Sequence, residues 1–165
     1  YLGWIIPWGT PVTLLGETAH EVAEAQREMV RIGIVRPAAM ATGKPEDWAA
    51  GEPLETFPVV GYADIAEARG QGEDPHVIDL RRDDERRAGH IVGTQHVPLH
   101  ELLSRVDEVP TDRQIWLHCA AGYRASVGAS ILKAAGRDVV LVDGDFYPNA
   151  ITAGLELSAE EPATA

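Results

Sequence analysis

The stretch that most constrains the fold is residues 114–136, where an apolar run leads into the only cysteine of the chain. Residues 114–118 predict a buried strand, and residues 125–136 predict a helix that a glycine ends. Cys119 therefore lies in a tight turn between a strand and a helix. Converging backbone N–H groups and the partial positive charge of a helix N-terminus favour a thiolate at such a position.

The turn combines residue types that suit a nucleophilic site. Gly122 permits a positive φ angle, and Arg124 supplies a fixed cation beside the sulfur. Strand alternation points the side chain of His118 away from the turn, which favours a structural role. Tyr123 at the rim either touches substrate or has no role. We expect an anion to be held by the N–H groups of Ala120, Ala121, Gly122, Tyr123 and Arg124. The alternative that Cys119 is only a small core residue stays open.

The composition of the chain excludes several classes of binding partner. The net charge of -12 over 165 residues argues against nucleic acid and against an anionic membrane surface, because both attract basic patches. A single cysteine excludes an internal disulfide and fits a reducing cytosol, so we expect a cytoplasmic location. No apolar run approaches the roughly 20 residues that span a bilayer. The chain begins with Tyr1, and we therefore expect it to be a piece of a longer protein.

The remaining chain alternates between predicted strands and helices, which indicates an α/β fold with a mostly parallel sheet covered on both faces. Strands are expected at 11–15, 36–40, 56–60, 76–81, 115–118 and 139–142, and helices or helical turns at 18–32, 45–48, 61–68, 83–88, 101–107 and 125–136.

An internal repeat divides the chain. Residues 12–16 align with residues 115–119, and the strand, turn, helix and glycine of the two copies then coincide without a gap. In the first copy Gly16 replaces the cysteine and Glu21 replaces the arginine, so that copy has no nucleophile. We therefore expect a catalytically inactive half unit, a partial βαβ repeat, over 1–53. It either docks on the full unit or pairs with a copy of itself in a homodimer. A full unit is expected over 54–157 and a flexible tail over 158–165.

Two motifs in the full unit resemble a known family. The first is Asp79-Leu80-Arg81, followed by Glu85, Gly89-His90-Ile91, Gly93 and Val97-Pro98; the second is Cys119-x-x-Gly-x-Arg124. In this order, residues 56–157 resemble a rhodanese domain, and the resemblance implies a three-layer α/β/α fold. The leading segment resembles the end of a second, degenerate unit, as in fusions of a metallo-β-lactamase-like domain with rhodanese domains.

The resemblance implies roles for individual residues. Cys119 and Arg124 are the expected catalytic pair, and Asp79, Arg81, Glu85 and His90 are expected to support the active loop. Asp79 and Arg81 leave their strand on one face and are expected to pair with Glu85 or nearby loop groups. A purely structural salt bridge is an equal alternative. His90, His96 and His100 are too loosely spaced for a metal site, so no metal is expected.

The implied activity is that of a sulfurtransferase without a cofactor. Cys119 takes the outer sulfur of thiosulfate or of a persulfide, forms a transient persulfide, and yields the sulfur to a thiol or to cyanide. Its expected partners are small sulfur donors and thiol acceptors, and a persulfide dioxygenase-like domain or another sulfur-relay protein. The family commonly has Gly-Gly before an aromatic near its last strand, and this chain has Asp143-Gly144-Asp145-Phe146 there. Asp143 and Asp145 are expected to disfavour anionic donors.

Three alternatives remain. A cysteine-loop phosphatase also needs a thiolate in a ring of N–H groups, but its wider loop has five residues between cysteine and arginine, and here four lie between Cys119 and Arg124. A non-catalytic regulatory module would make the cysteine incidental. A sulfur carrier would need the same loop as the enzyme.

Overall fold

The computed structural model describes residues 1–159, and the chain divides into two compact units. One unit contains Leu2 and Ile6–Thr56, and the other contains Tyr1, Gly3–Ile5 and the chain from Phe57 onward. The short helix α1 (Leu2–Ile5) lies mostly in the second of these units. Among the described residues, no helix has the length and apolar character needed to cross a membrane.

The larger unit is built on one sheet whose five strands are all parallel, in the order β3-β8-β7-β4-β6. Its strands are β3 (Val59–Val60), β4 (His76–Asp79), β6 (Gln95–His96), β7 (Ile115–His118) and β8 (Val139–Val142). All four residues of β8 are buried, as expected of an apolar strand covered on both faces. The register pairs Asp79 with His118, so β4 and β7 end side by side.

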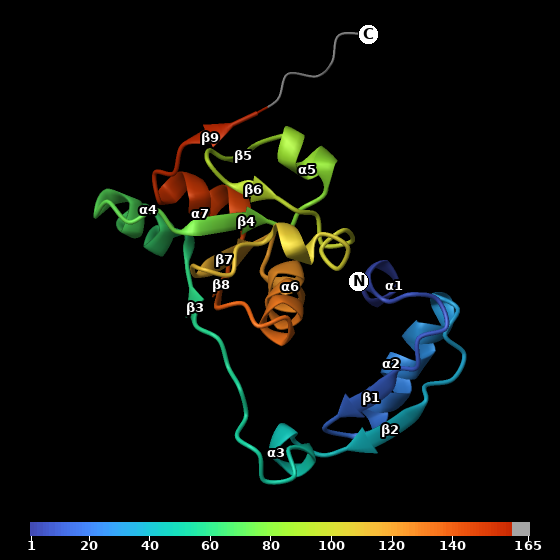
Figure 1. The fold of residues 1–165 in the computed structure, drawn as a ribbon. Helices are drawn as coiled ribbons and strands as arrows, with labels where there is room; N and C mark the ends of the chain where they lie inside the picture. Colours follow the sequence, from blue (N-terminus) through green and yellow to red (C-terminus); the bar gives the residue numbers. More distant parts are fainter. Residues whose placement is uncertain (160–165) are drawn as a thin grey trace, which may run out of the picture. The chain divides into compact units, whose positions relative to one another are not determined.

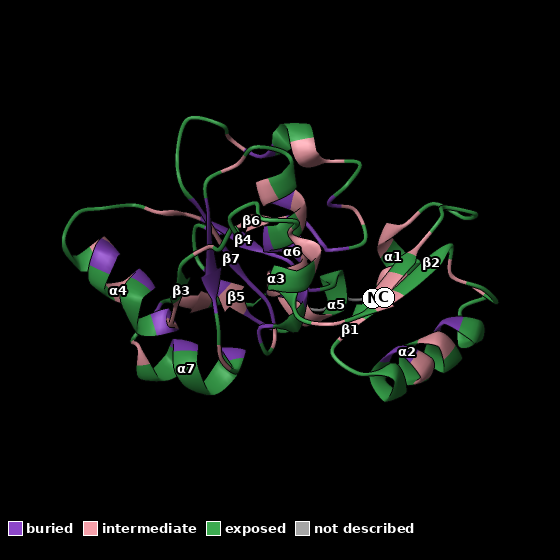
Figure 2. Cartoon of the chain, turned by 90° about the horizontal axis from the view of Figure 1, so that it is seen from below, coloured by how far each residue is buried: buried purple, intermediate pink, exposed green. Residues whose placement is uncertain are grey.

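Helices cover both faces of this sheet, which confirms the predicted α/β fold (Figure 1). On one face α4 (Tyr62–Gly70) and α7 (Phe146–Thr152) form a core with Val77 and Val142. On the other face α6 (Tyr123–Ala134) packs its small residues against Ile78, Leu117 and Leu141. Figure 2 shows the buried residues concentrated on the central strands and on the helix sides that face them.

Besides α7, where the sequence analysis predicts no helix, two segments of the larger unit differ from the sequence-based prediction. The helix expected at 101–107 is wrong: this segment makes turns and ends in the short 3₁₀ helix η1 (Val106–Glu108). The segment lies between Pro98 and Pro110 and is too short to repay the cost of starting an α-helix. Arg105 instead joins its turns by pairing with Glu101 and Glu108.

The second difference is a small antiparallel pair near the end of the described chain. Strand β9 (Leu157–Ser158) pairs with β5 (His90–Ile91), and Ser158 is the register partner of His90. The helical turn α5 (Asp83–Arg87) precedes β5. The sequence predicts a flexible tail over 158–165, but Ser158 lies in β9, and residues 160–165 lie outside the described part of the chain.

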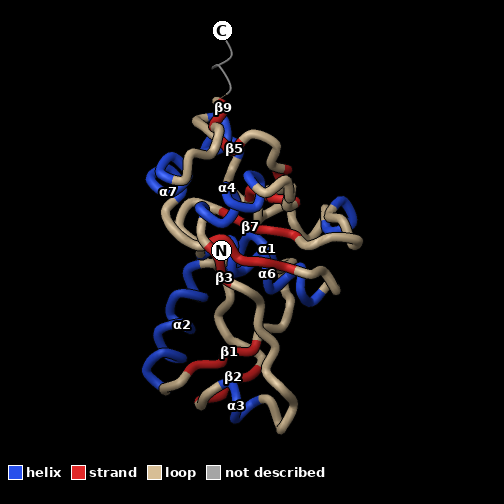
Figure 3. Tube along the Cα trace, turned by 90° about the vertical axis from the view of Figure 1, so that its left-hand side faces the viewer, coloured by secondary structure: helices blue, strands red, loops and turns tan. Residues whose placement is uncertain are grey.

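The smaller unit contains the predicted β-α-β element. Its elements are β1 (Thr13–Gly16), α2 (Ala19–Arg31) and β2 (Ala39–Thr42), followed by the turn of helix α3 (Pro45–Trp48). The two strands pair in parallel, and α2 lies along them (Figure 3). Thr18 and Glu21 form a capping box at the start of α2. The second strand begins three residues later than predicted, after Pro37, which has no N–H to donate.

Candidate active site

Cys119 directly follows β7, at the carboxyl end of the parallel sheet. The chain turns there and enters α6, with Gly122 as the residue before the helix at φ +82°. Only a residue without a side chain adopts this φ at little cost. Cys119 is 1% exposed and packs with the core on the α6 face. The sulfur is therefore carried beneath the loop rather than on an open surface.

Several backbone N–H groups in the loop from Cys119 to Arg124 are not used in hydrogen bonds among the described residues. Within residues 1–159, the N–H groups of Ala120, Ala121 and Arg124 donate to no protein acceptor. The carbonyl of Ala120 accepts from the N–H of Phe146 at 2.9 Å, which ties the loop to the start of α7. Unused donors in a turn beside a helix N-terminus suit an anion that arrives only during reaction.

Arg124 has a partner that the sequence analysis did not assign to it. Its guanidinium donates two hydrogen bonds to the carboxylate of Glu85, at 2.6 and 2.7 Å. These bonds with Arg124 hold the pKa of Glu85 below its usual value, against the effect of burial, and the bonds with Glu85 raise that of Arg124. The pair joins the first turn of α6 to α5. The charge of the arginine is therefore balanced.

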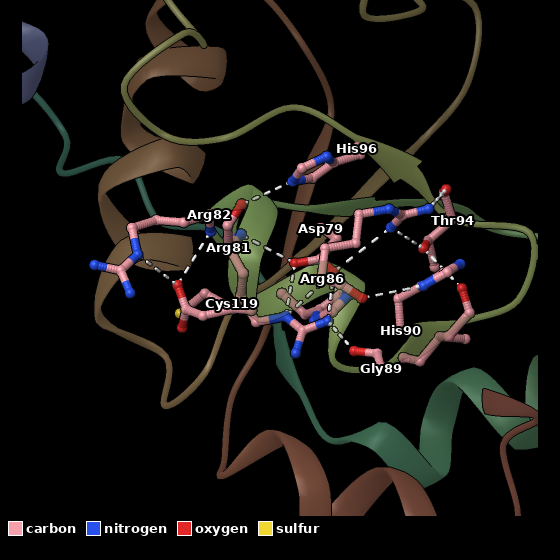
Figure 4. Close-up of polar contacts among 12 residues, drawn as sticks. Asp79, Arg81, Arg82, Arg86, Gly89, His90, Thr94, His96 and Cys119 are labelled. Carbon is pink, nitrogen blue, oxygen red and sulfur yellow. Dashed lines mark hydrogen bonds and ion pairs between the residues drawn. The ribbon is translucent and has the colours of Figure 1, made fainter. Parts of the chain in front are cut away.

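Asp79 and Arg81 pair with each other and not with Glu85, while Arg81 also bonds a nearby loop group, which is the other expected arrangement. Arg81 donates to both oxygens of Asp79, with the shortest contact at 2.7 Å, and to the carbonyl of Gly89 at 2.8 Å (Figure 4). Residues two apart along an extended chain share one face, which brings the two side chains together. The Arg81 guanidinium also lies 3.7 Å above the ring of Phe146.

This pair is almost fully buried, with exposed fractions of 0% for Asp79 and 1% for Arg81. Burial alone would raise the pKa of the Asp79 carboxyl, but His118 and the Arg81 guanidinium outweigh it and lower the pKa to about 2. Burial lowers the pKa of His118 to about 4, so its ring is neutral at neutral pH. Arg81 is therefore the main cation that faces Asp79 under those conditions.

His118 and Tyr62 lie under the cysteine loop. The His118 ring stacks on Phe146 at an interplanar angle of 12°, and its Nε2 makes no hydrogen bond with any described residue. The Tyr62 hydroxyl donates to the carbonyl of Cys119 at 2.9 Å and lies 3.5 Å from Nδ1 of His118. Burial and the nearby Cys119 raise the pKa of Tyr62, which keeps the hydroxyl protonated. The sequence analysis missed Tyr62, because nothing in its local pattern distinguishes it from a core aromatic.

We expect Tyr62→Phe to lower the free energy of unfolding by about 1 to 2 kcal/mol, because the buried Cys119 carbonyl loses its donor while the ring packing is kept. Urea denaturation measures this loss. The pH dependence of Cys119 alkylation in the same variant reports on the loop itself. A profile identical to that of the parent would restrict Tyr62 to a role in stability.

The remaining predicted residues have separate partners. Nδ1 of His90 donates to the carbonyl of Arg86 at 3.2 Å, and Nε2 of His96 donates to the carbonyl of Arg81 at 2.8 Å. His100 lies beside Glu101 instead. Among the residues that the structure describes, no three potential ligands come together in a way that could hold a metal ion.

Two open pockets flank the cysteine loop. One, of about 450 Å³, is lined by Arg81, Asp84, Glu85, Ala88, Ala120, Asp145, Phe146, Tyr147 and Pro148. The other, of about 420 Å³, is lined by Ala121, Gly122, Tyr123, Ser126, Leu141 and Asp143. Tyr123 is 76% exposed, so a partner can reach its ring. A small donor therefore has an approach to the loop on either side.

The fold and the loop together define a parallel α/β domain with a buried cysteine at a strand-to-helix turn. The family model of the rhodanese-like domain matches residues 62–148, and the chain belongs to this family. The solved structure of reduced CoADR-RHD of Bacillus anthracis is 33% identical with a TM-score of 0.53; the match covers 60% of this chain and 18% of that one. The rhodanese-related protein of Thermoplasma volcanium, 24% identical with a TM-score of 0.56, matches in fold over 63% of this chain and 100% of its own.

Relatives are also found by sequence. The HTH-type transcriptional regulator Rv0324 of Mycobacterium tuberculosis is 32% identical over 108 residues, which are 64% of this chain and 42% of that protein. The putative sulfur carrier protein YrkF of Bacillus subtilis is 26% identical over 85 residues, or 52% of this chain and 46% of YrkF. The chain thus spans less than half the length of these relatives.

Proposed function

We propose that this chain is a sulfurtransferase that moves a sulfane sulfur through a persulfide on Cys119. The thiolate attacks the outer sulfur of thiosulfate or of a persulfide, and a thiol or cyanide then removes that sulfur. Unused N–H groups of Ala120, Ala121 and Arg124 would hold the terminal sulfur as an anion. Glu85, Asp79 and Arg81 would fix the position of the loop, and no metal or cofactor takes part.

The observation that supports this proposal most directly is the position of the cysteine. Cys119 is buried at the carboxyl end of β7, beneath a short turn in which the N–H groups of Ala120, Ala121 and Arg124 find no protein acceptor among residues 1–159. A loop with only four residues between Cys119 and Arg124 suits a single sulfur atom better than a tetrahedral phosphate.

Intact mass after exposure to a sulfur donor tests the proposal. We expect the parent to gain the mass of one sulfur atom with glutathione persulfide, and Cys119→Ser to gain none, because a hydroxyl cannot form the persulfide. Treatment with a thiol reductant should remove the added mass. A parent that gains no sulfur from thiosulfate or from glutathione persulfide contradicts the proposal.

A sulfur carrier is the second candidate, and the similarity to a putative sulfur carrier protein favours it. A carrier would load Cys119 as the enzyme does but would yield its sulfur only to a partner protein. Turnover with small thiols or cyanide separates the two, since a carrier loads once and then stops. A regulatory module would take up no sulfur on Cys119. The similarity to a transcriptional regulator is the reason to test for this outcome as well.

We also propose that the smaller unit derives from a second, inactive copy of the domain. Support comes from its parallel β1-α2-β2 element and from Gly16, which occupies the position equivalent to Cys119. A sulfur-relay protein such as a persulfide dioxygenase-like domain would then be a partner of the whole protein. Sedimentation of the chain across a range of concentrations tests the alternative of a homodimer.

A further inference from the structure

Residues 143–146, between β8 and α7, run along the cysteine loop. Phe146 donates its N–H to the carbonyl of Ala120, and Asp145 forms an isolated antiparallel bridge with Ala121. A β-carbon at Gly122 would collide with Oδ1 of Asp143, so that carboxylate lies directly against the loop. The backbone therefore holds two carboxylates at fixed positions beside the turn that follows Cys119.

Each of the two pockets that flank the loop contains one of these carboxylates. Asp145 lines the pocket that Ala120 borders, and Asp143 lines the pocket that Ala121 and Gly122 border. Both aspartates are exposed, and neither makes an ion pair within residues 1–159. A donor that enters from either side therefore passes an unpaired negative charge.

The arginines near the loop do not offset this charge, because carboxylates already pair with them. These pairs are Arg81 with Asp79, Arg82 with Asp84, and Arg124 with Glu85. The backbone N–H groups remain as donors for one small anion, but the approach to them is acidic. Repulsion between like charges is strongest where water is partly excluded.

We propose that Asp143 and Asp145 determine donor specificity, admitting organic persulfides and excluding inorganic thiosulfate. This inference rests on the proposed sulfurtransferase activity. Thiosulfate carries two negative charges, spread over the outer sulfur and over oxygens that are two bonds away from it. An organic persulfide places an uncharged carbon group there, so it reaches the loop without bringing a dianion against the carboxylates.

The transfer balances for both donors. With a persulfide, the Cys119 thiolate bonds to the outer sulfur of R–S–SH, the S–S bond breaks, and R–S⁻ leaves with the electron pair. With thiosulfate, the same attack releases sulfite, SO₃²⁻, and leaves a persulfide anion on Cys119. Neither step needs an external oxidant or reductant. The donors differ in the charge that must pass the two aspartates.

The test is a comparison of loading rates. The second-order rate constant for sulfur loading of Cys119 is measured by intact mass, with thiosulfate and with the persulfide of 2-mercaptoethanol, which has an uncharged carbon group and carries at most one negative charge. Asp143→Asn with Asp145→Asn removes both charges and keeps the shapes of the side chains. The matched control, Asp107→Asn with Asp112→Asn, removes two exposed charges that line neither pocket.

We expect the thiosulfate-to-persulfide rate ratio to rise about tenfold in the Asp143/Asp145 variant and to stay within about twofold in the control, with the difference shrinking as salt is added. Three outcomes overturn the inference: an unchanged ratio, an equal rise in the control, or thiosulfate loading that stays undetectable in the variant. In each case, loading by the persulfide still supports the proposed function. A parent that neither donor loads overturns the proposed function itself.

Discussion

Asp79→Asn is expected to lower the free energy of unfolding by about 3 to 5 kcal/mol, because it leaves a buried guanidinium without its counter-charge. Arg81 is 1% exposed, and its side chain donates three hydrogen bonds to the carboxylate of Asp79. Arg86 also lies 3.6 Å from the same carboxylate. Asparagine keeps the shape but returns no negative charge to these two cations. Urea denaturation at neutral pH measures the loss.

Two further variants separate the charge from the packing. Asp112→Asn removes a carboxylate from the exposed pair with Arg113, and we expect a change below about 0.5 kcal/mol. Asp79→Leu combined with Arg81→Met removes both buried charges at similar volume, and it should be more stable than Asp79→Asn alone. If the single and double variants lose equal stability, an uncompensated charge is not the cause.

The second large effect is a loss of stability in acid that depends on His118. The ring is fully buried, and its folded-state pKa of about 4 lies below the ordinary value of 6.5. Between these values the unfolded chain binds a proton at this ring and the folded chain does not, so stability falls as pH decreases through this window. The expected contribution is about 3 kcal/mol between pH 7 and pH 4.

His118→Phe tests this contribution, since a phenyl ring can keep the stack on Phe146 but cannot titrate. Unfolding free energies of the parent and the variant are measured from pH 7 to pH 4, and the difference between the two curves should change by the expected amount. His20→Phe serves as the control for losing an exposed imidazole. Parallel curves for the parent and His118→Phe would contradict the assignment. Asp79 adds its own loss only at lower pH, where its carboxyl protonates.

The parts of the site that sequence predicted are those whose residues are close together in the chain. The strand, the turn at Cys119 and the helix after it are local, and the glycine at 122 has the positive φ that its position required. The parallel sheet follows from alternating apolar runs. The β-α-β element of the smaller unit likewise follows from local patterns.

The parts that sequence did not predict depend on contacts between distant segments. Tyr62 bonds to a carbonyl 57 residues away, and a tyrosine at a helix start carries no signal of that contact. Glu85 was expected to support the loop, but its partner Arg124 lies 39 residues away. Strand β9 is two residues long, too short for any period to be visible. Such contacts depend on the tertiary packing, which local propensity does not encode.

The tie between Ala120 and Phe146 has a consequence for synthesis of the protein. The nascent chain leaves the ribosome with its N-terminus first, so Cys119 emerges before β8 and α7 exist to close over the loop. Until residues 139–152 have followed, Cys119 has β7, the turn and α6 but lacks its packing on β8 and the bond from Phe146 that fixes the loop. A stalled or truncated chain would thus hold its cysteine in an untethered loop, whereas the completed chain fixes that loop.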